Sequence, residues 1–206
     1  LAPITGAEFR VGRECEQAFG ESIGRNIAPG DTKTMGMSCM IQAREEGRPC
    51  AFIPPAWAEH YTPADLPHRI PNLSNAHENF WYLEIGGDGD SIADTEKKRD
   101  ELLAMAYGLW DFGKNDPSQR EKNKNWRLDW VGILPGKRES RRYVGDYMLN
   151  QNDVEAEGRF EDTVAYGGWP MDVHVPGGAK DLASVGSRVY NFEGHYSIPY
   201  RCYYSH

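Results

Sequence analysis

The stretch FWYLEIGGDGDSIADTEKKRDELLAMAYGLWDFGKN, residues 80–115, contains the clearest strand and helix patterns of the chain and therefore decides the predicted fold. Its beginning, within residues 79–87, is aromatic and β-branched and closes on glycines, which predicts a β-strand. From Ser91 onward the apolar residues recur three and four positions apart, which predicts a helix with one apolar stripe. Ser91 and Asp94 form an imperfect capping box, because aspartate stands where glutamate or glutamine is usual. The stripe consists of Leu102, Met105, Ala106, Leu109 and Phe112 or Gly113.

The turn GGDGDS between this strand and this helix has the position of a phosphate-binding turn. With Gly87 and Gly89 as the first two glycines of G-x-G-x-x-G, the third position is Ile92. Asp88 and Asp90 would also repel a pyrophosphate at the helix N-terminus. We therefore interpret the turn as a helix start whose acids complement the helix dipole.

Further elements are predicted on both sides of this stretch. The predicted strands cover residues 34–45, 126–136 and 139–149, the latter two joined by a Pro-Gly turn, then a short strand from Trp169 and a last strand over 195–204. A short extended piece precedes a helical turn that ends near Gly20, and residues 49–71 are rich in proline. Because strands and helices do not alternate regularly, the predicted fold class is α+β. We expect one domain over residues 1–206, with a mixed, largely antiparallel sheet, a few helices and long Pro-rich loops.

The composition narrows the classes of function. The net charge is 23 − 31 = −8 with no basic stripe, which argues against a nucleic-acid partner. No apolar run approaches the roughly 20 residues of a membrane span. The four cysteines form no C-x-x-C pair, so reduced thiols are predicted, with two disulfides as the alternative. The six histidines are dispersed, and their spacing predicts no metal site.

The segment RRYVGDYMLNQNDV, residues 141–154, is a first candidate for a site. Arg141 and Arg142 occupy consecutive strand positions, so their side chains should point to opposite faces. One guanidinium could bind a carboxylate or a sugar diol. The alternative, which we favour from the residues alone, is an internal ion pair with Asp129, Asp146 or Glu139. Asn150 or Asn152 is expected to cap a following helix.

Three other segments contain further candidate site residues. Two of them follow residues 141–154 in the sequence and one precedes these residues. In GGWPMDVH, Trp169 offers an aromatic wall, and Asp172 and His174 share one face of a strand, where they could orient a ligand or share a proton. A structural corner that uses Asp172 as an acceptor is an equal alternative. In IPYRCYY, strand alternation places Tyr200 with Cys202 and Arg201 with Pro199 and Tyr203. In FWYLEI, Tyr82 and Glu84 share one side of the strand.

A series of motifs along the whole chain resembles one known family. These motifs are TGAEFRVGRE, FGES, DTKTMGMS, the stretch over residues 80–115, SRRYVGDYMLNQNDV, FEDTVAYGGWPMDVH and YSIPYRCYY. The series resembles the central part of bacterial FAD-dependent oxidoreductases, which are distantly similar to the fumarate reductase and succinate dehydrogenase flavoproteins. No single motif in the series is a recognised catalytic signature.

The resemblance implies a specific role for this chain. We expect the substrate-side (cap) domain of a larger FAD-dependent oxidoreductase, cut at both ends, with the Rossmann-like FAD-binding parts outside it. FAD is then the cofactor of the intact protein and is not expected on this fragment. The implied partners are a small-molecule substrate and the flavin domain of the same polypeptide. The compartment is left open between cytoplasm and periplasm, because any signal peptide would precede this chain.

The resemblance also implies which residues line the cleft. His174 is the expected general base, and either Arg142 or Arg141 faces the substrate, with Arg142 as the catalytic candidate. The other expected substrate-binding residues are Tyr147, Trp169, Asp172, Tyr200 and Arg201. The expected reaction is hydride transfer between a small polar or carbohydrate-like substrate and flavin.

Two further functions stay open beside this expectation. The first is a stand-alone carbohydrate- or ligand-binding module without catalysis, which the aromatic content would also suit. The second is a polysaccharide lyase, for which we find no array of base and charge neutraliser along the sequence.

Overall fold

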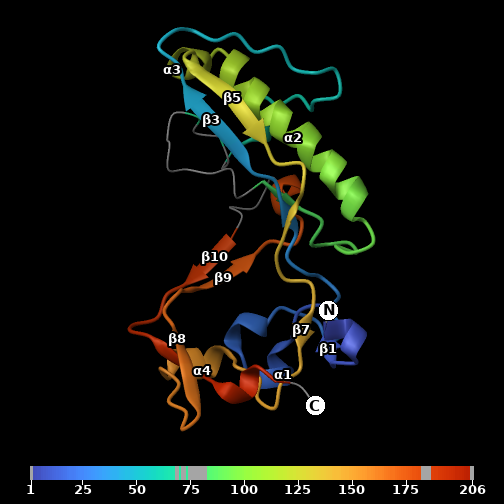
Figure 1. The fold of residues 1–206 in the computed structure, drawn as a ribbon, viewed down its shortest axis with the longest axis vertical. Helices are drawn as coiled ribbons and strands as arrows, with labels where there is room; N and C mark the ends of the chain where they lie inside the picture. The colour runs from blue at the N-terminus through green and yellow to red at the C-terminus, as the bar shows by residue number, and fades with distance from the viewer. Residues whose placement is uncertain (1, 68–69, 71–72, 74–82, 182–186, 205–206) are drawn as a thin grey trace. The chain divides into compact units, whose positions relative to one another are not determined.

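The computed structural model describes residues 2–67, 70, 73, 83–181 and 187–204. The chain folds into two compact units, each assembled from separate segments (Figure 1). Unit 1 comprises Leu1–Thr34, Glu139–Val173 and Arg188–His206, and unit 2 comprises Met35–Arg138 and His174–Ser187. The predicted α+β class is confirmed, and the strands whose pairing is described run antiparallel in small sheets.

Unit 2 is built around the long helix α2, Thr95–Asn115. All the predicted stripe residues are buried, including both Phe112 and Gly113, so the apolar stripe is confirmed. The helix begins at Thr95 because Asp90 closes the preceding turn: its Oδ1 accepts the amides of Ile92 and Ala93, each at 2.9 Å. The expected capping box is absent, since Asp94 occupies the N-cap without a side-chain hydrogen bond.

Two small sheets accompany α2 in unit 2, and Figure 1 shows the helix running beside one of them. That sheet pairs β3 with β5, and the other has the strand order β4-β2-β6. The paired residues Ile41 and Val131 of the first sheet enter a core that also contains Met37, Ile85 and Trp110. The bounds are β2 Met37–Ser38, β3 Ile41–Glu45, β4 Glu84–Ile85, β5 Trp126–Val131 and β6 Gly136–Lys137, with α3 Arg120–Asn123 and the 3-10 turns η3 Pro63–Asp65 and η4 Gly178–Lys180.

Unit 1 consists of short helices and two-stranded ribbons. β1 pairs with β7, and β8 pairs with β11. The predicted helical turn ends as expected, with Gly20 as a left-handed C-cap, and Asn150 caps α4 with its side chain on the amide of Asn152. The bounds are η1 Ala2–Thr5, β1 Phe9–Arg10, α1 Glu16–Phe19, η2 Ser22–Gly24, β7 Arg142–Tyr143, α4 Gln151–Glu155, β8 Thr163–Gly167, β11 Tyr196–Pro199 and η5 Tyr200–Cys202.

The paired strands β9, Met171–His174, and β10, Ser187–Tyr190, contribute residues to both units. The strand predicted after Trp169 is therefore confirmed as β9. The strand predicted near the start of the 79–87 segment is described only from residue 83 onward, so Tyr82 lies outside the described residues.

Several predicted elements were wrong in extent. The strand predicted over 126–136 ends at Val131 as β5, and of the strand predicted over 139–149 only Arg142–Tyr143 form a strand, β7. The predicted Pro-Gly turn is not a turn between two strands, because Gly136 begins β6 and pairs with Ser38 of β2. The predicted strand over 34–45 is broken into β2 and β3. The last strand ends at Pro199, and Tyr200–Cys202 form a 3-10 turn. Strand alternation therefore does not govern the faces of Tyr200, Arg201 and Cys202.

Candidate functional site

Glu84 is a carboxylate in the buried strand β4, with only 3% of its surface exposed. A buried carboxylate needs hydrogen-bond partners, because an unpaired charge in an apolar interior is strongly unfavourable. The first partner is the backbone amide of Gly36, which donates to Glu84 Oε1 at 3.0 Å. This amide precedes β2, the strand that pairs with β4, so sheet formation itself brings donor and acceptor together.

The second partner of Glu84 is His174, the last residue of β9. Its Nδ1 lies 2.8 Å from Glu84 Oε2, and the two side chains are only 6% and 4% exposed. On the other side of the ring, Arg138 Nη1 lies 3.3 Å from His174 Nε2. A guanidinium only donates, so Nε2 accepts and the ring proton resides on Nδ1, where it is donated to Glu84.

Two glycines let the backbone approach Glu84 closely. A Cβ on Gly36 would lie 2.5 Å from the carbonyl oxygen of Ile85 and 2.8 Å from Cγ of Glu84. A Cβ on Gly178 would lie 1.9 Å from the carbonyl oxygen of Glu84, and Gly178 also has a φ of +57°, which side chains rarely adopt. Larger residues at these positions would displace β4 and with it the carboxylate.

The Glu84–His174 pair has the elements of a general base. The carboxylate fixes the tautomer and the orientation of the ring and would stabilise an imidazolium, while the lone pair of Nε2 is the basic site. Arg138 occupies that lone pair with an exposed guanidinium hydrogen bond.

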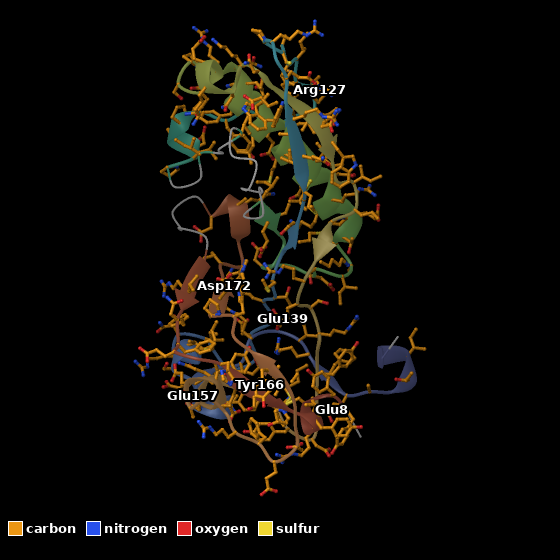
Figure 2. The ribbon with its side chains drawn as sticks, turned by 60° about the vertical axis from the view of Figure 1, so that its left-hand side comes forward. Glu8, Arg127, Glu139, Glu157, Tyr166 and Asp172 are labelled. Atoms are coloured by element: carbon orange, nitrogen blue, oxygen red, sulfur yellow. The ribbon has the colours of Figure 1, made fainter. Side chains whose placement is uncertain are left out.

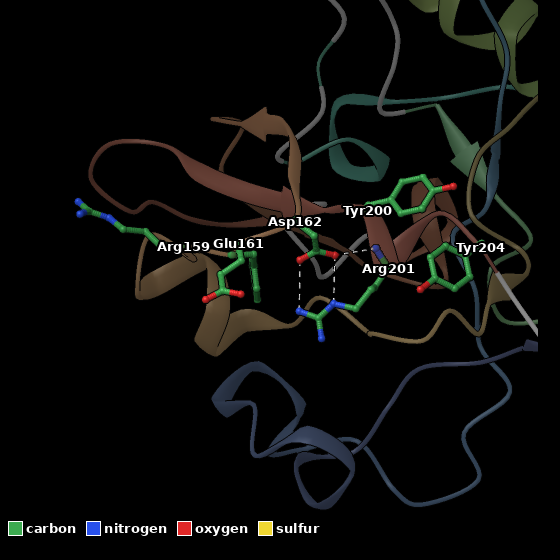
Figure 3. Close-up of a pocket in the computed structure, with 7 residues that line it drawn as sticks. Arg159, Glu161, Asp162, Tyr200, Arg201 and Tyr204 are labelled. Carbon is green, nitrogen blue, oxygen red and sulfur yellow. Dashed lines mark hydrogen bonds and ion pairs between the residues drawn. The ribbon is translucent and has the colours of Figure 1, made fainter.

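Unit 1 carries a separate group of predicted residues around η5. An open pocket of about 580 Å³, called here the η5 pocket, contains Tyr200 and Arg201 (Figure 3). Asp162 binds Arg201 through two guanidinium nitrogens, Nε at 3.0 Å and Nη2 at 3.3 Å, and also accepts its backbone amide at 3.2 Å. The pocket is lined by Arg159, Phe160, Glu161, Asp162, Tyr200, Arg201 and Tyr204.

Tyr147 lies beside this pocket. The guanidinium carbon of Arg201 is 5.2 Å from the centre of the Tyr147 ring, and the Tyr147 hydroxyl donates to Asp153 at 2.7 Å. Burial, together with the hydrogen bond to the Asp153 carboxylate, raises the pKa of Tyr147 to about 12. The structure therefore brings three of the predicted residues together: Tyr147, Tyr200 and Arg201.

The two consecutive arginines have different partners. Arg142 is half-buried and binds Glu14 at 2.8 Å, Glu139 and the carbonyl oxygen of Gly12. The ion pair with Glu139 confirms one of the partners that we considered from the sequence. Arg141 lies with its guanidinium carbon 5.1 Å from the centre of the Phe9 ring. Both arginines hold β7 to the N-terminal segment of unit 1.

Two predicted residues lie near or in β9. Trp169 precedes the strand and is 78% exposed. Asp172 lies within β9 and is partly exposed (Figure 2). His174 shares that strand, but its described carboxylate partner, Glu84, comes from β4.

One comparison with known proteins identifies the family of this chain. The model of the family described as "FAD dependent oxidoreductase" matches residues 1–206. The chain belongs to this family. No curated protein and no solved structure matches it. Within the described residues, no helix combines the length and apolar character needed to cross a membrane.

Membership of the FAD-dependent oxidoreductases implies that intact members use FAD, so we tested whether the residues around the α2 N-terminus fit its pyrophosphate. They do not. Asp90 accepts the amides of Ile92 and Ala93, which a phosphate would need as donors. Asp88 adds a second acid to the same turn. The turn therefore repels phosphate, as the sequence predicted.

Several residues of these two groups had no predicted role: Glu84, Arg138, Arg159, Phe160, Glu161, Asp162 and Tyr204. Glu84 carried a usable signal, since it is a single charged residue in the apolar run YLEIGG. A charge inside a buried strand indicates a buried partner. Arg138 and Asp162 carried no such signal, because their partners lie 36 and 39 residues away in sequence.

Proposed function

We propose that this chain forms the substrate-side region of an FAD-dependent oxidoreductase, in which hydride passes between a small polar or carbohydrate-like substrate and flavin. Family membership supports the class of reaction. The acidic turn before α2 argues against binding of the FAD pyrophosphate at that helix N-terminus. A distant relationship to the fumarate reductase and succinate dehydrogenase flavoproteins, and a bacterial origin, are part of the same proposal.

The observation that carries the proposal is the buried pair of Glu84 and His174. In this proposal, a substrate hydroxyl replaces Arg138 at His174 Nε2 and gives up its proton to the ring. Glu84 then faces an imidazolium at 2.8 Å, which it stabilises by charge. A positioned base of this kind contributes about 10²- to 10⁴-fold to a proton-transfer step.

The remaining predicted residues have different proposed roles, and these roles rest on different kinds of support. Within unit 1, Tyr147, Tyr200 and Arg201 are proposed as ligand contacts in their own right, because they gather at the η5 pocket. Trp169, Asp172 and Arg141 are proposed as further substrate contacts on the basis of the resemblance alone. Arg142 is proposed to act by holding β7, because its guanidinium is already bound to Glu14 and Glu139.

The test is flavin reduction by sugars and hydroxy acids in the full-length protein, followed under anaerobic conditions by flavin absorbance. With a substrate that reduces the wild type, His174→Ala should slow reduction at least tenfold. Glu84→Gln should also slow it, because an amide can hold the ring but cannot stabilise its charge.

His60→Ala is the matched control for this test. His60 lies in the same unit, also faces a carboxylate, with Nδ1 3.9 Å from Asp111, and has a side chain that is 83% exposed. Its replacement should leave reduction unchanged. If His174→Ala reduces flavin at the wild-type rate while its circular dichroism is unchanged, the base is not His174 and the proposed site is wrong.

A further inference from the structure

The η5 pocket has the size and composition of a ligand site. Its volume of about 580 Å³ falls within the range of roughly 300–1,000 Å³ that is usual for small-molecule sites. Aromatic and charged side chains share its walls, and all of them belong to unit 1. The chemistry of these walls indicates which class of ligand the pocket suits.

Two tyrosines provide an exposed aromatic surface. The rings of Tyr200 and Tyr204 have centres 5.2 Å apart and planes inclined by 48° (Figure 3). Tyr200 is 56% exposed, and its hydroxyl has no hydrogen-bond partner within the part of the chain that the structure describes. An exposed ring with an available hydroxyl suits a ligand that has an apolar face and a polar edge.

The charges on the pocket walls cancel. Arg159 and Arg201 contribute two positive charges, and Glu161 and Asp162 contribute two negative ones. A site for a phosphate or a carboxylate would carry an excess of positive charge, and a site for a cation the reverse. The balance therefore favours a neutral ligand over an ionised one.

The polar groups left available are arranged for hydroxyl groups. Arg201 uses Nε and Nη2 for Asp162, and its Nη1 makes no hydrogen bond within the described residues. The planar ion pair fixes this guanidinium, so a ligand can be bound without first ordering a flexible side chain. Glu161 adds carboxylate acceptors at the same pocket. Arg201, Glu161 and Tyr200 thus contribute a donor, an acceptor and an aromatic face to one pocket, which are the groups that the hydroxyls and the C–H face of a pyranose require.

We propose that the η5 pocket binds a neutral sugar ring, with one face of the sugar against Tyr200 and its hydroxyls on Arg201 and Glu161. In naming a carbohydrate, this inference rests on the substrate class of the proposed function. It does not depend on proton transfer at His174, because it concerns binding alone.

The experiment is anaerobic isothermal titration calorimetry of the full-length, FAD-loaded protein with neutral methyl pyranosides and their short oligosaccharides. At least one of these sugars should bind saturably. Tyr200→Ala should weaken its binding at least tenfold, whereas Tyr200→Phe, which keeps the ring, should stay within about threefold to fivefold of the wild type.

Tyr203→Ala is the matched control. Tyr203 follows the same 3-10 turn and is 62% exposed, but it does not line the pocket. Its replacement should leave sugar binding unchanged. The inference is overturned if no neutral sugar binds, if glucuronate or inorganic phosphate binds more tightly than the neutral sugars, or if Tyr203→Ala weakens binding as much as Tyr200→Ala.

The two proposals fail in distinguishable ways. Binding of a neutral sugar that Tyr200→Ala weakens and Tyr200→Phe preserves supports the pocket, whatever the rate of flavin reduction in His174→Ala protein. A requirement for His174 in flavin reduction, without any binding of neutral sugars that depends on Tyr200, overturns the pocket and leaves the proposed base in place.

Discussion

Lys114 in the last turn of α2 donates from Nζ to the carbonyl oxygen of Asn123 at 2.7 Å, although only 6% of Lys114 is exposed. The same ammonium donates to the carbonyl oxygens of Lys124 at 3.0 Å and Trp126 at 2.6 Å. All three of its protons therefore have acceptors in the segment that leads from α3 into β5. This one side chain fixes how α2 is joined to the neighbouring strand.

Lys114→Met should lower the free energy of unfolding by about 3 kcal/mol, because it removes the ammonium donor from the carbonyl groups of Asn123, Lys124 and Trp126, of which that of Lys124 keeps the amide of Cys50. Urea unfolding followed by circular dichroism measures the change. Lys97→Met is the matched control on the exposed surface of α2 and should stay within about 0.5 kcal/mol of the wild type. Equal effects of the two changes would contradict the role assigned to the three carbonyl contacts.

Asp31 should make stability depend on pH at the acid end. The hydrogen bonds from Arg13, aided by an amide bond from Lys33, lower the pKa of Asp31 from 3.8 to about 2. Because the folded-state pKa is depressed, the stabilisation is present above pH 3.8 and is lost as the pH falls through about 2. Roughly 1–2 kcal/mol should disappear across this window, allowing for solvent screening.

The measurement is the urea midpoint of the wild type and of Asp31→Asn between pH 5 and pH 2. The variant should lose stability at pH 5 and show a flatter profile below pH 4. Asp100→Asn, at an exposed carboxylate that is also paired with an arginine, should keep the wild-type slope. A wild-type slope in Asp31→Asn would show that other acids govern this window.

Gly36→Ala should destabilise unit 2 and disturb the Glu84–His174 pair. The added methyl would lie 2.5 Å from a backbone oxygen of β4, which cannot move aside as a flexible side chain can. We expect a loss of about 1–3 kcal/mol. Gly47→Ala, where nothing lies within 4 Å of the added carbon, should change stability by less than about 0.5 kcal/mol. The melting temperatures of both variants, measured by thermal unfolding, make the comparison. If Gly36→Ala melts at the wild-type temperature, β2 and β4 are less closely packed than described.

Cys39 should be the least reactive thiol of the chain. Its side chain is buried, its Sγ lies 3.3 Å from the carbonyl oxygen of Gly132, and burial raises the pKa of the thiol to about 11. Because the thiolate is the reactive form, iodoacetamide should modify Cys15, Cys50 and Cys202 before Cys39 in native protein. Mass spectrometry of tryptic peptides gives the order, and the four cysteines should react alike in urea. Early labelling of Cys39 in native protein would contradict its buried position.

The sequence predicted the parts of the fold that depend on neighbours in the chain. The α2 stripe, the helical turn that ends near Gly20 and the asparagine cap of the helix after residue 150 each rest on residues within a few positions of one another, and each is confirmed. The last strand was extended too far, because YRCYY is as aromatic as a strand but turns at Tyr200. There the contacts that Arg201 makes with Asp162, 39 residues earlier, accompany a 3-10 turn.

The sequence predicted several residues of the candidate sites, but it did not predict most of the residues that they contact. Alternation suggested that Asp172 and His174 act together, but the described carboxylate beside the imidazole comes from Glu84, 90 residues away. The Arg142 ion pair with Glu139 was foreseeable because the two residues are three positions apart, whereas its bond to Glu14 spans 128 positions. The periodicity of a sequence indicates which side chains share one face of a strand or helix. It does not indicate which residues 90 or 128 positions apart become partners, because the tertiary fold brings these together.

The division of the chain into interleaved units has a consequence for its synthesis. Unit 1 draws on residues 1–34, and β1 at Phe9–Arg10 finds its partner only in Arg142–Tyr143 of β7. At about 5–20 residues per second, the ribosome needs several seconds or more to make the intervening chain. During that interval β1 has no strand partner. The ribosome meanwhile makes residues 35–138, which are most of unit 2. Unit 2 is complete only after residues 174–187 have been made, and unit 1 only after residues 188–206, so each unit depends on a segment that is translated long after its first one.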